Sequence, residues 1–263
     1  MKRLAPCLFL AVLVTIPAMA VFAPGGYAFA QSPADYMNRG NAAYRAGDYG
    51  LAIELYKTAG VENAGLFYNR ANAHFKKGEI GLAIVYYIRA QRIMPRDTDI
   101  RSNLDYARKV RADRLETEKE PWALAAAVVP YRMLSMNEHA FAALFLFTFL
   151  LALLAFNAGS LKENVKVNAP LKIKGAAIVV AVLLCAQVAV TGMKTYNEKG
   201  VAHAVAMVDE TTAFSAPSTD SDKVFKLHEG IEMIRKRGEN GFALIVLPTG
   251  WTGWIPEEAL EII

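Results

Sequence analysis

The strongest constraint on this chain is an internal repeat with a period of 31 residues, because self-similarity at a fixed period is typical of helical repeat arrays. Residues 38–59 align with residues 69–90, and eleven of the twenty-two aligned pairs are identical. A glycine followed by an acidic residue, Gly47-Asp48 or Gly78-Glu79, divides each copy into two parts with helical spacing of apolar residues. We therefore predict two helix-turn-helix units, an arrangement that usually forms a binding surface.

Small and aromatic residues are expected to pack these helices. Alanines permit close helix approach, and aromatic rings fill the remaining space; these residues are Ala52, Ala59, Ala83, Ala90, Tyr44, Phe75, Tyr56 and Tyr87. A further apolar stripe at Ile100, Leu104, Ala107 and Val110 predicts one more helix that caps the array. The predicted repeat domain with its capping helix spans residues 33–118.

Two later segments account for the high apolar content of 54%. Residues 140–161 and residues 175–193 carry no charged side chain, and each is long enough to cross about 30 Å of hydrocarbon. We predict two transmembrane helices, since buried core helices normally keep a polar stripe. Cys185 in the second run is expected to be buried. The juxtamembrane segment 119–139 contains Trp122, which either lies at the membrane interface or packs beneath the repeat domain.

The orientation follows from two separate signals. Residues 1–30 combine a basic start, an apolar run and an Ala-Phe-Ala end, which predicts a secretory signal cleaved after Ala30; an uncleaved anchor is the alternative. The loop 162–174 is rich in lysine, which predicts that it is cytoplasmic; its lysines are Lys162, Lys166, Lys172 and Lys174. The repeat domain and the C-terminal domain should then both lie outside the bacterial cytoplasmic membrane.

Residues 204–263 predict a small all-β domain, because short β-rich runs alternate there with turn residues. The expected strands are 204–208, 223–227, 231–235, 242–247 and 251–255. In the fourth strand, Phe242, Leu244 and Val246 are expected to face the core.

The repeats resemble the tetratricopeptide repeat, whose signature positions are matched by Gly40, Ala52, Tyr56, Ala59, Ala83, Tyr87, Ala90 and Pro95. The resemblance implies that the first helix of each pair lines a groove for a peptide or a partner helix. The partner-binding residues would be Asn41, Arg45, Asn72 and Lys76. The alternative is that the asparagines only bridge helices and the cations are solvated.

The C-terminal run resembles the bacterial SH3-like domain, mainly through the ending Gly250-Trp-Thr-Gly-Trp-Ile-Pro-Glu-Glu-Ala-Leu. This resemblance implies a small barrel with Trp254 in its base. Trp251 is a candidate ligand platform, and packing onto a neighbouring domain is the alternative role. The proline-peptide signature of eukaryotic SH3 domains is missing.

The order of these parts resembles the BatE-type membrane proteins of bacterial aerotolerance operons, as do the runs Asn103-Leu-Asp-Tyr-Ala-Arg and Leu134-Ser-Met-Asn-Glu. Membership would imply a complex with von Willebrand A-type Bat membrane proteins and, indirectly, a MoxR-type ATPase. We expect a membrane-anchored scaffold that binds partner proteins. The alternative is a wall-sensing receptor whose SH3-like domain binds peptidoglycan.

Catalysis is not expected. No phosphate loop, nucleophile elbow, dinucleotide fingerprint or zinc motif is present, and His74, His139, His203 and His228 lie in separate contexts. The carboxylates show no apolar setting that would raise a pKa for acid-base work. Residues 97–120 carry mixed charges, which indicates a solvated helix and not a nucleic-acid patch. We therefore predict a non-enzymatic protein with no cofactor and no metal site.

Overall fold

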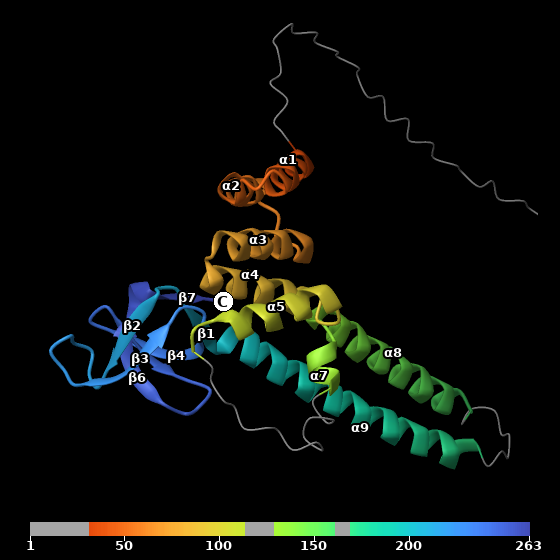
Figure 1. Cartoon of the computed structure of the whole chain (residues 1–263). Helices are drawn as coiled ribbons and strands as arrows, with labels where there is room; N and C mark the ends of the chain where they lie inside the picture. The colour runs from red at the N-terminus through yellow and green to blue at the C-terminus, as the bar shows by residue number, and fades with distance from the viewer. Residues whose placement is uncertain (1–31, 114–128, 161–168) are drawn as a thin grey trace, which may run out of the picture. The chain divides into compact units, whose positions relative to one another are not determined.

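The structure is a computed structural model that describes residues 32–113, 129–160 and 169–263. The predicted signal segment 1–30, the segment around Trp122 and the first part of the predicted cytoplasmic loop lie outside these ranges. The described residues form a helical part, a helical hairpin and an antiparallel sheet (Figure 1).

The repeated segment folds as two helix pairs, with the breaks where the sequence predicts them. The four helices are α1 (Pro33–Arg45), α2 (Tyr49–Ala59), α3 (Ala64–Lys77) and α4 (Ile80–Ile93). Gly47 and Gly78 take the positive φ values of 82° and 92° that a side chain would disfavour. Asp48 then caps α2 by accepting a hydrogen bond from the Leu51 backbone.

Small residues allow these helices to approach closely, as predicted. Ala52 and Ala83 are completely buried, and Tyr56 retains only 1% exposure. Gly40 lies directly against the Tyr56 ring, where an added Cβ atom would come within 2.5 Å of a ring carbon. Gly40 and Tyr56 are therefore in direct contact between α1 and α2, and this contact leaves no room for a side chain at position 40.

Helix α5 (Thr98–Val110) covers the end of the array beside α4, as the apolar stripe predicts (Figure 1). Ile100, Leu104 and Ala107 are buried. Val110 was predicted to belong to the same stripe, and this was wrong because its side chain is 45% exposed. It is the last residue of α5, where no neighbouring helix among the described residues covers it.

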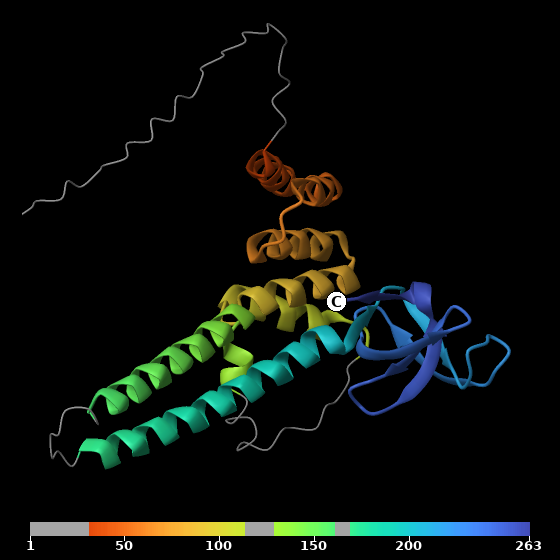
Figure 2. The ribbon, with the colours of Figure 1, turned by 180° about the vertical axis from the view of Figure 1, so that it is seen from behind.

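Two long helices, α8 (Met136–Ser160) and α9 (Ala169–Thr195), run side by side in both views (Figures 1 and 2). A short helix, α7 (Val129–Met133), precedes them, and a π-helical turn, Tyr196–Gly200, comes after them. Both long helices are long and apolar enough to cross a membrane. Within their most apolar windows only 6% and 11% of the residues are buried, whereas the core helices of soluble proteins are mostly covered. The helices begin before the predicted spans because lysines and polar residues flank each apolar run without ending the helix.

Cys185 was predicted to be buried, and its side chain is exposed on α9, so contacts with the rest of the protein do not bury it. An apolar sequence context does not distinguish a residue that faces the other helix from one that faces outward.

The C-terminal domain is a seven-stranded antiparallel sheet with the order β3-β2-β6-β5-β4-β1-β7. The strands are β1 (Ala202–Ala206), β2 (Glu210–Phe214), β3 (Lys223–His228), β4 (Glu232–Glu239), β5 (Phe242–Val246), β6 (Thr252–Pro256) and β7 (Leu260–Ile262). The sequence predicts only five of them. Strand β2 carries the polar run Glu-Thr-Thr and β7 has three residues, so neither has a strong pattern of its own, and pairing with β3 and β1 defines them.

The prediction for the inward face of β5 was also wrong. Ala243 and Ile245 are completely buried in the core of the sheet, whereas Phe242, Leu244 and Val246 are only partly buried. Every residue of this strand is apolar, so alternation alone does not identify the buried face. Trp254 on β6 is buried, as predicted.

The sheet packs onto the helical part. Val205 on β1 is completely buried in a cluster with residues of α4 and α5. Arg89 on α4 forms an ion pair of 3.1 Å with Glu261 on β7. The domain that follows the hairpin in sequence therefore packs against the helices that precede the hairpin.

Candidate functional site

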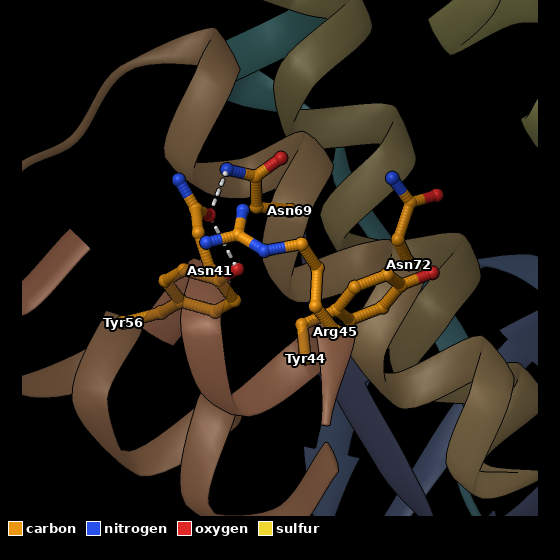
Figure 3. A pocket seen from close by; sticks show the side chains of 6 residues that line it. All are labelled: Asn41, Tyr44, Arg45, Tyr56, Asn69 and Asn72. Carbon is orange, nitrogen blue, oxygen red and sulfur yellow. Dashed lines mark hydrogen bonds between the residues drawn. The ribbon is translucent and has the colours of Figure 1, made fainter. Parts of the chain in front are cut away.

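The candidate site is a hollow on the helical part, between the first helices of the two pairs. It has a volume of ≈ 250 Å³ and is lined by Asn41, Tyr44, Arg45, Tyr56, Asn69 and Asn72 (Figure 3). Three of the four residues predicted to bind a partner, Asn41, Arg45 and Asn72, therefore lie together. Helices α1, α2 and α3 supply the lining, so the site exists only when the two repeats pack against each other.

Asn41 connects three helices through its side-chain oxygen. Its Oδ1 atom accepts a hydrogen bond from the Tyr56 hydroxyl at 2.7 Å and another from Nδ2 of Asn69 at 3.2 Å. Figure 3 shows both bonds converging on this oxygen. The acceptor of Asn41 is therefore used within the protein.

Asn72 repeats this arrangement one period later. Its Oδ1 atom accepts hydrogen bonds from the Tyr87 hydroxyl at 2.5 Å and from Nδ2 of Asn103 at 3.1 Å. Asn103 comes 31 residues after Asn72, the same interval that separates Asn72 from Asn41. The sequence singles out Asn103 as part of a family resemblance but not as a partner of Asn72, although continuing the period of 31 residues into α5 would have predicted this.

The two tyrosines stay protonated at neutral pH. Burial raises the pKa of Tyr56 to about 12, and burial is also the main reason that the pKa of Tyr87 lies well above its ordinary value. Each hydroxyl therefore remains a donor to its asparagine oxygen. The bridging role that the sequence left open for Asn41 and Asn72 is real.

The bridging hydrogen bonds use only the Oδ1 atom of each asparagine side chain. Within the described part of the chain, Nδ2 of Asn41 and Nδ2 of Asn72 have no hydrogen-bond partner. Figure 3 shows the amide nitrogen of Asn41 directed away from the Tyr56 hydroxyl. The site thus presents two N–H donors, because both asparagine oxygens already accept hydrogen bonds within the protein.

The two predicted cations differ in their placement. Arg45 lines the hollow from the last turn of α1 and is exposed. Lys76, its counterpart in α3, is also exposed but does not line the hollow. A partner that occupies the hollow would therefore meet two amide donors and one guanidinium group, which suits peptide carbonyls and a carboxylate.

His74 has a packing role. Its ring lies parallel to the Tyr86 ring at 5.3 Å, and its Nδ1 atom is 2.6 Å from Oε2 of Glu79. Burial lowers the pKa of this histidine and outweighs the opposing effect of Glu79. His74 is outside the lining of the hollow.

Trp251 is the second candidate position, on the C-terminal sheet. Its side chain is 61% exposed, and its ring lies 5.6 Å from the Phe225 ring. Trp254, three residues further along the chain, is buried instead. The C-terminal domain therefore presents the exposed ring of Trp251, with the partly buried ring of Phe225 beside it.

The expectation that no carboxylate lies in a setting that raises its pKa was wrong. Burial raises the pKa of Glu229, which lies in the turn between β3 and β4. Its Oε1 atom accepts a hydrogen bond from the backbone N–H of Gly81 on α4 at 2.8 Å. This carboxylate therefore joins the sheet to the helices, a contact that its position in the sequence does not reveal.

Among the described residues, no group of three or more His, Cys, Asp or Glu side chains could hold a metal ion. In comparisons with known proteins, no protein-family model matches the sequence, and the search of curated proteins finds no match.

Proposed function

We propose that this protein is a non-enzymatic, membrane-anchored scaffold whose helical repeats and C-terminal domain bind partner proteins. In this proposal the repeats are of the tetratricopeptide type and the C-terminal sheet is an SH3-like barrel, as their sequence resemblances imply. The observation that carries the proposal is the pair of unpartnered amide donors on Asn41 and Asn72, held in place by buried tyrosines within the described part of the chain. A pre-ordered row of donors suits the backbone of an extended peptide or a partner helix.

The contacts between the sheet and the helices support a common side for both domains. Arg108 on α5 binds Glu232 on β4 at 2.7 Å, and Val205 is buried against α4 and α5. If α8 and α9 cross a bilayer as a hairpin, such contacts require both domains to lie on one face. The lysines of the connecting loop then favour the extracytoplasmic face of the bacterial inner membrane.

The partners that we propose are membrane proteins of the von Willebrand A-type Bat class, with an indirect link to a MoxR-type ATPase. This rests on the resemblance to BatE-type proteins in the order of parts. The lipid bilayer is the second partner, because the side chains of α8 and α9 are apolar and largely uncovered.

Photocrosslinking in native membranes tests this proposal. A photoreactive amino acid replaces Tyr44, which lines the hollow, and crosslinked partners are identified by mass spectrometry. The same probe at the exposed residue Arg101 on α5 is the control. We expect membrane-protein adducts from position 44 that are absent from position 101. Equal adducts from both positions would remove the support for a partner groove.

A second candidate function is a wall-sensing receptor, and the exposure of Trp251 beside Phe225 favours it. Open aromatic faces bind sugar rings and peptides through apolar contact. Retention of the full chain on purified peptidoglycan fragments, and its loss in Trp251→Ala, would support this role. Wild-type protein that is not retained would exclude it.

A further inference from the structure

A second pocket, of ≈ 580 Å³, lies on the helical part and shares only Tyr56 with the hollow of Figure 3. Helices α2, α3 and α4, the connection after α2 and Ile263 of the C-terminal domain contribute to its wall. Four cationic side chains line it, namely Lys57, Arg70, Arg89 and Arg92, against a single acidic one, Glu62. The lining side chains therefore carry a net charge of +3 (four minus one) at neutral pH.

Two of these arginines, Arg70 and Arg89, lie over the same aromatic ring, that of Tyr86. The guanidinium carbon of Arg70 lies 4.0 Å from the centre of the Tyr86 ring, and that of Arg89 lies 5.2 Å from the same centre. Cations over an aromatic ring are stabilised by it, but two cations on one ring repel each other. The fold thus holds like charges together without fully neutralising them.

Among the described residues, Arg89 is the one lining cation that forms an ion pair. Nη2 of Arg89 pairs with Glu261 at 3.1 Å, a carboxylate outside the pocket lining. Nε of Arg70 is buried and has no hydrogen-bond partner in the described residues. Burial is the main cause that lowers the pKa of Arg70 and of Arg92, and the charge of Arg89 lowers both further. Tyr86 and Glu54 oppose this lowering at Arg70, and Glu198 opposes it at Arg92. A bound anion would offset this repulsion and restore hydrogen bonds to the guanidinium groups.

The rest of the wall is largely apolar. Leu66, Phe67 and Ile93 line the pocket between the cations, and Ile93 is 43% exposed. A lone phosphate would leave this apolar surface and most of the volume unused. A peptide segment with acidic and apolar side chains in alternation would satisfy both parts of the wall.

We infer that this pocket binds an acidic segment of a partner protein in which apolar residues lie between the carboxylates. The inference rests on the proposed scaffold function and adds the chemistry of a partner at a surface separate from the amide hollow. Arg92 is the residue best suited to test it, because Arg70 and Arg89 also make hydrogen bonds within the fold.

The experiment uses the full chain in detergent micelles and a fluorescein-labelled octapeptide of alternating leucine and glutamate, monitored by fluorescence anisotropy. We expect saturable binding that weakens with salt. Arg92→Gln should weaken it about tenfold, the loss expected when one charge-assisted hydrogen bond is removed. Lys57→Gln, at an exposed position, should also weaken binding and serves if Arg92→Gln does not fold. Arg101→Gln, on α5, is the matched control and should bind like the wild type.

Three results would overturn the inference. The first is equal binding of the same peptide with glutamine in place of glutamate. The second is wild-type affinity in both Arg92→Gln and Lys57→Gln. The third is binding of inorganic phosphate without binding of the peptide, which would indicate a small-anion site.

The crosslinking experiment from position 44 separates this inference from the scaffold proposal. Partner adducts in membranes without acidic-peptide binding would overturn the inference alone. Peptide binding that depends on Arg92, in a protein that captures no membrane partner, would support the pocket and contradict the scaffold.

Discussion

Arg108 on α5 donates two hydrogen bonds to Glu232 on β4, from Nε at 2.7 Å and from Nη2 at 2.8 Å, although 124 residues separate them in sequence. The intervening chain includes both long apolar helices. This ion pair therefore joins the domain before the hairpin to the domain after it. Because the geometry is bidentate, it also fixes the orientation of the sheet on α5.

Breaking this pair should loosen the sheet from the helices. We expect Glu232→Gln to lower the free energy of unfolding by about 1–2 kcal/mol, less than for a fully buried pair, because solvent reaches 34% of Arg108 and 28% of Glu232. Chemical denaturation in detergent measures the change. The exposed pair Arg237 and Glu239, 3.9 Å apart, is the control, and Glu239→Gln should change stability by less than about 0.5 kcal/mol. Equal effects would show that the inter-domain pair has no special role.

Alanine substitutions at Gly40 and Gly65 should change the stability of the protein differently. Gly40→Ala should destabilise the protein by about 1–3 kcal/mol, because its Cβ would lie 2.5 Å from the buried Tyr56 ring. Gly65→Ala in α3 meets nothing closer than 3.5 Å among the described residues and should be neutral or stabilising by up to about 1 kcal/mol through helix propensity. Thermal unfolding of the two variants provides the comparison. A stable Gly40→Ala protein would mean that α1 and α2 are not packed as described.

Substitutions at Asn72 can separate its bridging role from binding. Asn72→Ala leaves the Tyr87 hydroxyl without its acceptor and removes one of the two acceptors of the Asn103 amide, which should cost about 1–3 kcal/mol of stability. Asn72→Asp keeps the acceptor but replaces the N–H donor with an oxygen. We expect this variant to retain most of its stability and to lose partner capture in the crosslinking assay. Partner capture at the wild-type level in Asn72→Asp would show that Asn72 bridges helices and does not bind the partner.

Lys76 provides the matched comparison in the same helix. Because it does not line the hollow, Lys76→Ala should change partner capture much less than Arg45→Ala. Crosslinking yields from position 44 in the two variants measure this difference. A larger loss in Lys76→Ala would favour a groove in which both cations face the partner, as the sequence alone predicts.

His74 predicts a specific pH dependence of stability. Its pKa in the folded protein lies below the ordinary value of 6.5, chiefly because of burial, so the unfolded chain binds the proton first as the pH falls. Stability should therefore be undiminished above pH 6.5 and should decrease on acidification from 6.5 down to the folded pKa. His74→Gln should remove this dependence of stability on pH. Urea denaturation measured at a series of pH values across this range tests the expectation. Glu79→Gln, which removes the negative charge that opposes the lowering of this pKa, should extend the slope to lower pH.

Local patterns in the sequence predicted the helices of this protein well. The period of 31 residues and the glycine-acidic pairs located the breaks after Gly47 and Gly78, because backbone conformation at a turn depends on the residue itself. The long uncharged runs predicted α8 and α9 for a similar reason, since length and composition alone decide whether a helix can span a bilayer.

The candidate site was predicted only in part. The repeat placed Asn41, Arg45 and Asn72 on equivalent helices, and the structure brings these three together. The pattern did not show that both asparagine oxygens are occupied, because their partners Tyr56 and Tyr87 lie on other helices.

Patterns along the chain were thus enough to identify the helical segments and to locate the apolar hairpin to within a few residues. Three-dimensional packing was needed to show which face of β5 is buried, that Lys76 does not line the hollow that Arg45 lines, and that several arginines line one pocket. The physical reason is that local structure follows from propensity and periodicity among neighbouring residues. Burial and charge environment depend instead on contacts between elements that are distant in sequence.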